Sequence, residues 1–259
     1  MHPLSDRPHM ELPDYLKSVI DDIAATSTAF AANYAAETPI HAAPFFGQID
    51  TASYATVGLN PSPAEFRNSR WHAQPLPLSD HLSRLLNYFH NPQIPYYASW
   101  FDWWERALGS LGRSYFRDTV HLDLSARATI PVGNCPDKRI FVRMIQNDIK
   151  WFFRLLSNAP QLRGLLVAGS SWSITRNDAV GAVYLDRVIR DTAAANGFTL
   201  TRVTVLKQSN PRIALYRLRL PNGRMMPLFF CGASPSSNTP ETLIQCIQSQ
   251  SKLLKHNGF

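Results

Sequence analysis

Residues 54–66 read YATVGLNPSPAEF, and the rest of the chain is organised around this stretch. The part from Tyr54 to Leu59 is apolar or small at nearly every position, which is typical of a strand buried on both faces. It is followed by Asn60-Pro61-Ser62-Pro63, in which the prolines fix the backbone and remove hydrogen-bond donors. We therefore expect a buried strand that delivers Asn60 into a stiff loop and holds its side chain still for chemistry. The alternative is that Asn60 makes an Asx-turn and that the prolines only end the strand.

The composition is that of a folded protein. With 259 residues, 45% of them hydrophobic, the chain can bury a substantial core in a single domain. Lys and Arg number 26 against 19 Asp and Glu, and the resulting net charge of +7 is dispersed along the chain. Dispersed positive charge suits a folded surface that attracts a polyanion, although many basic proteins have no anionic partner.

Cysteines and apolar runs bear on the protein's location. Cys135, Cys231 and Cys246 are odd in number and widely spaced, so we expect a reducing compartment and neither a disulfide framework nor a zinc site. No apolar run is long enough to cross a bilayer, and the first residues, MHPLSDRP, lack the apolar core of a secretion signal. We therefore expect a cytoplasmic protein.

Helical and strand periodicities alternate along the chain. Helical spacing covers residues 13–36, 82–89, 136–158 and 180–196 and a last segment from Thr239; Ser79-Asp80 is the expected N-cap of the second helix, and Gly197 closes the fourth. Strands are expected at 54–59, 118–124, 165–168 and 199–206, and at 213–220 and 225–231 on either side of a hairpin turn. The aromatic segment 99–111 is expected to be core.

This alternation predicts an α/β fold with three layers, α/β/α, around a mostly parallel central sheet, and with the C-terminal hairpin as an addition. We expect one domain over residues 1–259, with an N-terminal helical cover at 1–45 and a core at 54–250. Ligands of such sheets bind beyond the carboxyl ends of the strands. Polar loops at 60–63, 123–125, 169–171 and 234–238 all follow expected strands, so we expect them to meet in one cleft.

Three of these loops carry motifs of a known family. Gly58-Leu59-Asn60-Pro61-Ser62-Pro63 resembles the Gly-x-Asn-Pro-Gly loop that activates water in the thymine-DNA and single-strand-selective branches of the uracil-DNA glycosylases. Ser234-Pro235-Ser236-Ser237 resembles the Met-Pro-Ser-Ser or His-Pro-Ser-Pro loop that enters the DNA minor groove, and Gly169-Ser170 resembles the Gly-Ser loop that grips a backbone phosphate. In this order they resemble the uracil-DNA glycosylase superfamily, from about Tyr54 to the last helix.

The resemblance implies a role for each motif residue. Asn60 would position the attacking water, the backbone N–H of Leu59 would meet an oxygen of the base, and Phe66 would stack on the flipped base unless it is an ordinary core ring. The implied enzyme uses no cofactor and no metal. The implied DNA contacts, mostly to phosphates, are Ser62, Pro63, Gly169, Ser170, Ser234, Pro235, Ser236 and Ser237.

Two departures from the family pattern bear on the substrate. Ser234 stands where many members have a histidine that assists the leaving base. Asp123 stands where uracil glycosylases have an asparagine that reads the edge of the base. An ionised Asp only accepts hydrogen bonds, which suits the N4 amino group of cytosine. Asp123 is thus expected to select cytosine or a modified cytosine; the alternative is that it caps a turn or pairs with Arg127.

Histidines are the remaining candidates for catalysis. None of His72, His81, His90 and His121 has the spacing of a zinc site. His121 lies two positions before Asp123 and should share its face of the strand. Two roles are open to it: assistance to the leaving base, or a hydrogen-bonded structural role.

The favoured function is that of a monofunctional DNA glycosylase in base excision, a monomer that acts on flipped bases in DNA and has no membrane partner. Removal of unmodified cytosine would destroy the host genome. A cytosine-directed pocket therefore implies tight control of access, or a modified base such as a hydroxymethylated or glycosylated cytosine of viral DNA, which would suit phage defence. Three alternatives are a uracil or thymine mismatch glycosylase, a DNA-binding protein on the same scaffold that does not cut, and a small-molecule enzyme at the same sheet edge.

Overall fold

A computed structural model describes residues 10–33, 42–62, 76–90, 98–129, 138–168, 185–208, 212–232 and 239–249. These residues form six α-helices, α1 (Leu12–Thr26), α2 (Leu78–Leu86), α3 (Ala98–Gly109), α4 (Lys138–Asn158), α5 (Leu185–Ala193) and α6 (Thr239–Ser249). They also form two short 3-10 helices, η2 (Thr28–Asn33) and η5 (Ala194–Asn196). The seven strands are β1 (Phe45–Phe46), β2 (Tyr54–Gly58), β3 (Thr119–Asp123), β4 (Gly164–Ala168), β5 (Thr199–Lys207), β6 (Ile213–Arg219) and β7 (Met225–Cys231).

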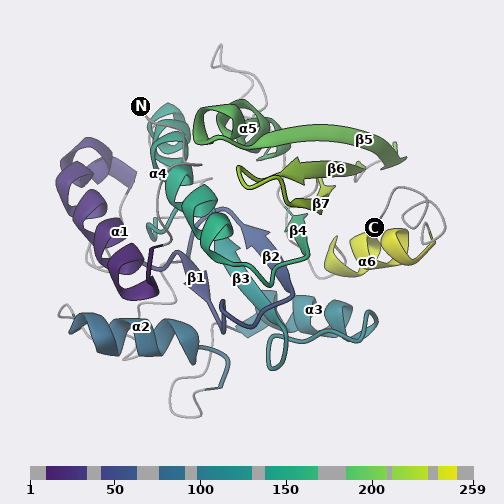
Figure 1. Ribbon diagram of the computed structural model, residues 1–259, viewed down its shortest axis with the longest axis horizontal. Coiled ribbons are helices and arrows are strands. Elements are labelled where there is room, and N and C mark those ends of the chain that lie inside the picture. The colour runs from purple at the N-terminus through teal and green to yellow at the C-terminus, as the bar shows by residue number, and fades with distance from the viewer. Residues whose placement is uncertain are drawn as a thin grey trace.

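All seven strands belong to one mixed sheet, in the order β1-β3-β2-β4-β7-β6-β5 (Figure 1). The four central strands, β3, β2, β4 and β7, are parallel to one another. Their carboxyl ends therefore lie at the same edge of the sheet. Strand β1 is antiparallel on one flank, and β6 and β5 are antiparallel on the other. The α/β class and the parallel centre of the sheet are confirmed.

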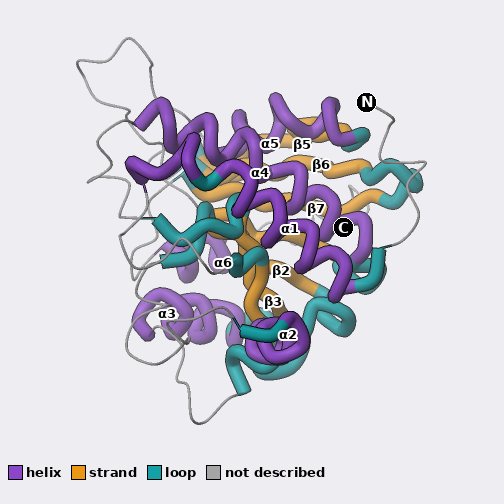
Figure 2. The backbone as a smooth tube through the Cα atoms, turned by 90° about the vertical axis from the view of Figure 1, so that its left-hand side faces the viewer, coloured by secondary structure: helices purple, strands orange, loops and turns teal. Residues whose placement is uncertain are grey.

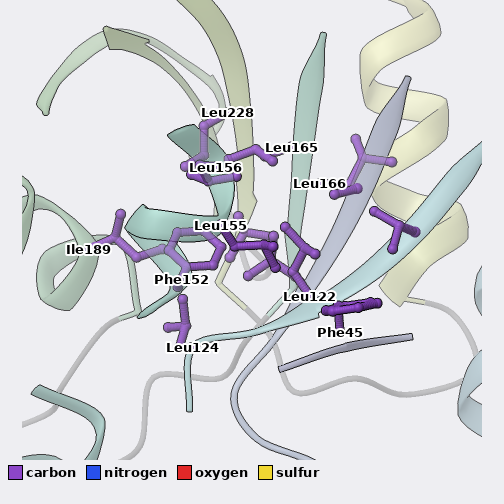
Figure 3. Close-up of a cluster of buried hydrophobic side chains, with 14 of the residues drawn as sticks. Phe45, Leu122, Leu124, Phe152, Leu155, Leu156, Leu165, Leu166, Ile189 and Leu228 are labelled. Carbon is purple, nitrogen blue, oxygen red and sulfur yellow. The ribbon is translucent and has the colours of Figure 1, made fainter. Parts of the chain in front are cut away.

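Helices cover both faces of this sheet, with α1 and α4 on one side of the strands and α3 on the other (Figure 2). The face toward α4 is apolar, and each fully buried Leu or Phe there contributes about 1.5–3 kcal/mol. Helix α1 lies against α4, where the ring of Tyr15 packs edge-on against Trp151. Figure 3 shows the cluster between the sheet and its helices: Leu122, Leu165 and Leu228 with Phe152, Leu155 and Leu156 of α4 and Ile189 of α5.

Most expected elements are confirmed, with two corrections. Helix α2 begins at Leu78 after Pro77, so Ser79 and Asp80 lie inside its first turn and are not the N-cap. The extended ψ of Pro77, 143°, leads the chain into the helix without a side-chain cap. The predicted hairpin forms, but β7 also pairs with β4 in parallel, so this hairpin is part of the central sheet and not an addition to it.

Strand β1 was not predicted from the sequence. The two-residue strand β1 is too short to give a periodic signal, and it forms because Phe45 and Phe46 pair with Leu122 and His121. No helix among the described residues combines the length and the apolarity that crossing a bilayer requires.

Candidate functional site

The candidate site lies where β2 and β3 end side by side. Their register pairs Thr56 with His121 and Gly58 with Asp123. Because side chains alternate along a strand, His121 and Asp123 share one face of the sheet, as the sequence predicted. This face is turned toward α3: the ring of Trp100 lies 4.7 Å from that of His121, edge to face.

Asp123 and His121 form a buried pair. Asp123 is 4% exposed, and its Oδ1 lies 3.4 Å from Nε2 of His121. Its second oxygen, Oδ2, is buried and has no hydrogen-bond partner among the described residues. Burial raises the pKa of Asp123 above its ordinary value, and His121 offsets part of this effect. The shift favours the neutral acid over a wider range of pH than for an exposed Asp.

Gly58 makes room for this pair. A Cβ atom at position 58 would lie 2.8 Å from Oδ1 of Asp123 and 2.9 Å from Nε2 of His121. Contacts this short do not occur with a real side chain, so only glycine lets the carboxyl and the imidazole lie over the end of β2. This gives the Gly of the Gly-Leu-Asn-Pro motif a physical reason.

A chain of hydrogen bonds continues from His121 into the core. Nδ1 of His121 lies 2.8 Å from Oγ1 of Thr56, which lies 2.6 Å from the hydroxyl of Tyr115. All these atoms are buried. The imidazole also lies parallel to the ring of Phe46 and edge-on to that of Phe101, at centroid distances of 6.2 and 5.3 Å.

The side chain of Asn60 is held in one orientation just beyond β2. Its Nδ2 donates to the carbonyl oxygens of Pro61, at 3.2 Å, and Arg127, at 3.1 Å, and to Oγ1 of Thr129, at 2.9 Å. Since carbonyl oxygens only accept, the nitrogen must lie on this side of the amide. Oδ1 of Asn60 accepts no hydrogen bond from any described residue, so the alternative of an Asx-turn is wrong.

The backbone that receives Asn60 is fixed by a buried ion pair. The guanidinium of Arg127 donates from Nε to Oδ2 of Asp148 at 2.8 Å and from Nη2 to Oδ1 at 3.2 Å. Oγ of Ser125 donates to the same carboxylate at 2.5 Å. Arg127 also donates to the carbonyl of Ile23 at 3.3 Å and to the hydroxyl of Thr26. We call Arg127, Asp148 and Ser125 the Arg127 clamp; it ties helices α1 and α4 to the loop that holds Asn60.

These contacts settle several predictions about single residues. Arg127 pairs with Asp148, so the predicted alternative of an Asp123–Arg127 pair is wrong. Asp123 accepts no hydrogen bond from a backbone group either, so it caps no turn among the described residues. Leu59 directly follows β2, and its carbonyl accepts from the backbone N–H of Ser125 at 2.9 Å, which fixes its position.

The structure brings only some of the predicted site residues together. Asn60, Leu59, Asp123 and His121 lie at the same sheet edge, and Ser62 follows, half-buried. Sequence reasoning missed Thr56, Tyr115 and Thr129, because their roles depend on the register between strands. The other predicted residues lie outside the described part of the chain: Pro63, Phe66, Gly169, Ser170, Ser234, Pro235, Ser236 and Ser237.

The chain was compared with known protein families, curated proteins and solved structures. No protein-family model matches the chain, and no curated protein or solved structure matches it either. Within the described ranges, no three His, Cys, Asp or Glu side chains are grouped so that they could hold a metal ion. The geometry of the site is therefore the basis on which a function can be proposed.

Proposed function

We propose that the protein is a DNA N-glycosylase, which hydrolyses the bond between a flipped base and its deoxyribose and leaves an abasic site. The observation that carries this proposal is the fixed carboxamide of Asn60 at the sheet edge where Asp123 is buried. The proposal includes the fold of the uracil-DNA glycosylase superfamily, action as a monomer in the cytoplasm and no need for a cofactor.

The orientation of Asn60 supports the water-positioning role. Breaking an N-glycosidic bond builds positive charge on the sugar, and catalysis then requires water held beneath it and stabilisation of the departing base. All three hydrogen bonds of Asn60 use Nδ2, which leaves Oδ1 as an acceptor for that water. A neutral amide cannot remove a proton at neutral pH, so its contribution is to position the water and not to act as a base.

Burial of Asp123 supports its role as the group that meets the base. A buried polar atom without a partner costs free energy, and Oδ2 of Asp123 is such an atom. A hydrogen bond to an extruded base would satisfy it. We propose a cytosine-type base, in particular a modified cytosine such as that of viral DNA; a role in phage defence would follow from that substrate.

Release of the base from defined DNA tests this function. Single- and double-stranded oligonucleotides that contain uracil, thymine mismatches, cytosine, hydroxymethylcytosine or its glucosylated form are incubated with the protein, and alkali-labile abasic sites are counted. We expect abasic sites at a cytosine-type base and loss of about 100-fold or more of the rate in Asn60→Ala. Asn87→Ala is the matched control, because Asn87 is exposed at the end of α2, where its Nδ2 donates to Ser83 and its Oδ1 accepts from Nε2 of Gln48.

The outcomes separate the alternatives. Release of uracil or thymine without release of any cytosine-type base would show a uracil or mismatch glycosylase and would contradict the proposed substrate. Salt-sensitive binding to DNA without abasic sites on any oligonucleotide would show a DNA-binding protein that does not cut. No salt-sensitive affinity for DNA at all would favour a small-molecule enzyme.

A further inference from the structure

The hydrogen-bond chain beside Asp123 has a direction that can be worked out from its members. Tyr115 is buried, and among the described residues its hydroxyl has one hydrogen-bond partner, Oγ1 of Thr56 at 2.6 Å. A buried hydroxyl hydrogen without an acceptor is costly, so Tyr115 donates to Thr56. The hydrogen of Thr56 then has one acceptor left, which is Nδ1 of His121 at 2.8 Å.

The direction of this chain fixes the tautomer of His121. Because Nδ1 accepts from Thr56, the ring carries its hydrogen on Nε2. Nε2 lies 3.4 Å from Oδ1 of Asp123, so its hydrogen is on the side of this carboxyl.

The tautomer in turn decides which oxygen of Asp123 can carry a proton. Oδ1 is the oxygen that lies against Nε2–H of His121, so a proton on Oδ1 would meet that hydrogen. Oδ2 is buried and receives no hydrogen bond, so it is the remaining position; a hydrogen there has no acceptor among the described residues until a base enters. Burial raises the pKa of Asp123, which agrees with a proton at this oxygen.

We propose that Tyr115, Thr56 and His121 are positioning residues that keep Asp123 a neutral acid with its hydrogen on Oδ2. We further propose that Asp123 gives this hydrogen to ring nitrogen N3 of a cytosine-type base as the glycosidic bond breaks. This inference rests on the proposed function. It supplies the leaving-group assistance that the family's histidine, replaced by Ser234, would otherwise give.

In this step, each bond that breaks is matched by one that forms. The O–H bond of Asp123 breaks and an N3–H bond forms, while the C1′–N1 bond breaks and its electron pair goes to N1. The base leaves as a neutral tautomer, and Asp123 becomes a carboxylate. Water held by Asn60 adds to C1′ and loses one proton, and this proton restores the acid form of Asp123 directly or through solvent.

A fixed proton on Oδ2 also discriminates between bases. Cytosine-type bases present a bare lone pair at N3 and an amino group at N4, so Oδ2–H can donate to N3 while Oδ1 accepts from N4. Uracil presents a hydrogen at N3 and an oxygen at O4, and in the same pose both contacts would be repulsive. A free carboxylic acid could move its proton and accept either base; the hydrogen-bond chain prevents this exchange.

Few ionisable groups act on Asp123 within the described residues. His121, on the same strand, is the one that contributes directly to its electrostatics. Tyr115, which precedes β3, has a raised pKa, mainly because it is buried. The charges of Glu105 in α3 and of Asp123 also raise the pKa of Tyr115. Glu105 itself is bound by the hydroxyl of Ser114 and the backbone N–H of Tyr115.

Substitution of Thr56 tests the proposal with little change of shape. Thr56→Val removes the hydroxyl that donates to His121, and Thr56→Ser retains it. In single-turnover release of a cytosine-type base, we expect the wild-type rate to fall as pH rises through the raised pKa of Asp123. We expect Thr56→Val to lose about tenfold or more in rate, to shift this pH profile and to reduce the preference for cytosine-type bases over uracil. Thr56→Ser should restore all three.

Substitution of Asp123 separates recognition from acid catalysis. Asp123→Asn can still donate from the position of Oδ2, but it cannot transfer a proton. We expect this variant to bind DNA with the same base on a 2′-fluorinated, cleavage-resistant sugar about as tightly as wild type. Its rate of release should fall by about 100-fold or more, and the pH dependence assigned to Asp123 should disappear.

A spectroscopic measurement keeps this inference distinct from the proposed function. Nitrogen NMR of His121 should show the Nε2–H tautomer in wild type and in Thr56→Ser, and a changed tautomer in Thr56→Val. A wild-type enzyme that releases bases, with the same rate, pH profile and base preference in Thr56→Val, would overturn the inference alone. An Nδ1–H tautomer in wild type would do the same. Absence of abasic sites on every substrate, with the tautomer as expected, would overturn the glycosylase and with it the acid role of Asp123.

Discussion

Single atoms decide what the candidate site can do. The missing Cβ of Gly58 leaves space for two buried polar side chains, and the three hydrogen bonds of Asn60 fix one amide. These features act together, since Gly58 and Asn60 lie two residues apart at the end of one strand. Each can be tested by a single substitution.

Alanine at position 58 should disturb the pair of Asp123 and His121. The added methyl group would lie within 3.0 Å of both side chains, which are buried and have little space to move. We expect Gly58→Ala to lower the free energy of unfolding by about 1–3 kcal/mol, measured by urea denaturation. Gly109→Ala is the control, because a Cβ there meets nothing within 4 Å. Equal stability of the two variants would argue against the close approach.

The buried acid also makes a testable link between pH and stability. The pKa of Asp123 is raised in the folded state, so the folded protein holds this proton more tightly than the unfolded chain, in which an Asp has a pKa of about 3.9. Its contribution to stability is therefore complete below about pH 4 and is lost as pH rises through the folded-state pKa. Relative to Asp123→Asn, wild type should become less stable over this range in urea titrations. A constant difference at every pH would contradict this expectation.

Asp118 should make stability depend on pH in the opposite direction, so it serves as the comparison. Burial raises the pKa of Asp118, but its hydrogen bonds to Arg113, Ser114 and Thr119 and the charge of Arg113 outweigh that effect, so its pKa is lowered overall. Its contribution should be lost as pH falls, and wild type should lose stability relative to Asp118→Asn in acid.

At the scale of elements, the Arg127 clamp connects helices to the site. Arg127 reaches α1 through Ile23 and Thr26 and α4 through Asp148, while its own carbonyl accepts from Asn60. The position of α1 and α4 on one face of the sheet therefore helps to fix the loop that holds Asn60. The N-terminal helix is thus more than a cover for apolar surface.

Breaking the Arg127 clamp should lower the stability of the folded protein. The side chains of Arg127 and Asp148 are 0% and 3% exposed, so Asp148→Asn would leave a buried guanidinium without its counter-charge. We expect a loss of about 3–5 kcal/mol in the free energy of unfolding. The control is Asp21→Asn in the pair of Lys17 and Asp21, whose side chains are 64% and 62% exposed, where about 0–1 kcal/mol is expected. Similar losses in both variants would show that burial of the clamp is not what matters.

Elements were predictable from the sequence to different degrees. Strands β2, β3 and β4 and the long helix α4 follow from apolar periodicity, a local property of the chain. Strand order and register are not local, so the contact of Thr56 with His121 and the anchoring of Asn60 by Thr129 could not be predicted. Burial of Asp123 could not be predicted either, because it depends on α3 and β2, which lie elsewhere in the sequence.

For the whole molecule, the proposed function predicts an electrostatic contribution to DNA binding. The net charge of +7 favours a polyanion, and each phosphate contact should lower log K by about 0.9 per tenfold increase in salt. Fluorescence anisotropy between about 50 and 200 mM salt should therefore show affinity that falls steeply. Affinity that does not change with salt would contradict a DNA substrate.

The position of β7 has a consequence for how the chain folds. Strand β7 is an inner strand beside β4, yet α5, β5 and β6 separate the two in sequence. The parallel centre of the sheet cannot form completely until β7, the last strand, has left the ribosome. Until then, one edge of β4 has no strand paired with it. Long-range parallel pairing of this kind is slow and prone to aggregation. Productive folding of this protein should therefore be post-translational and should benefit from slow synthesis or from chaperones that shield that edge.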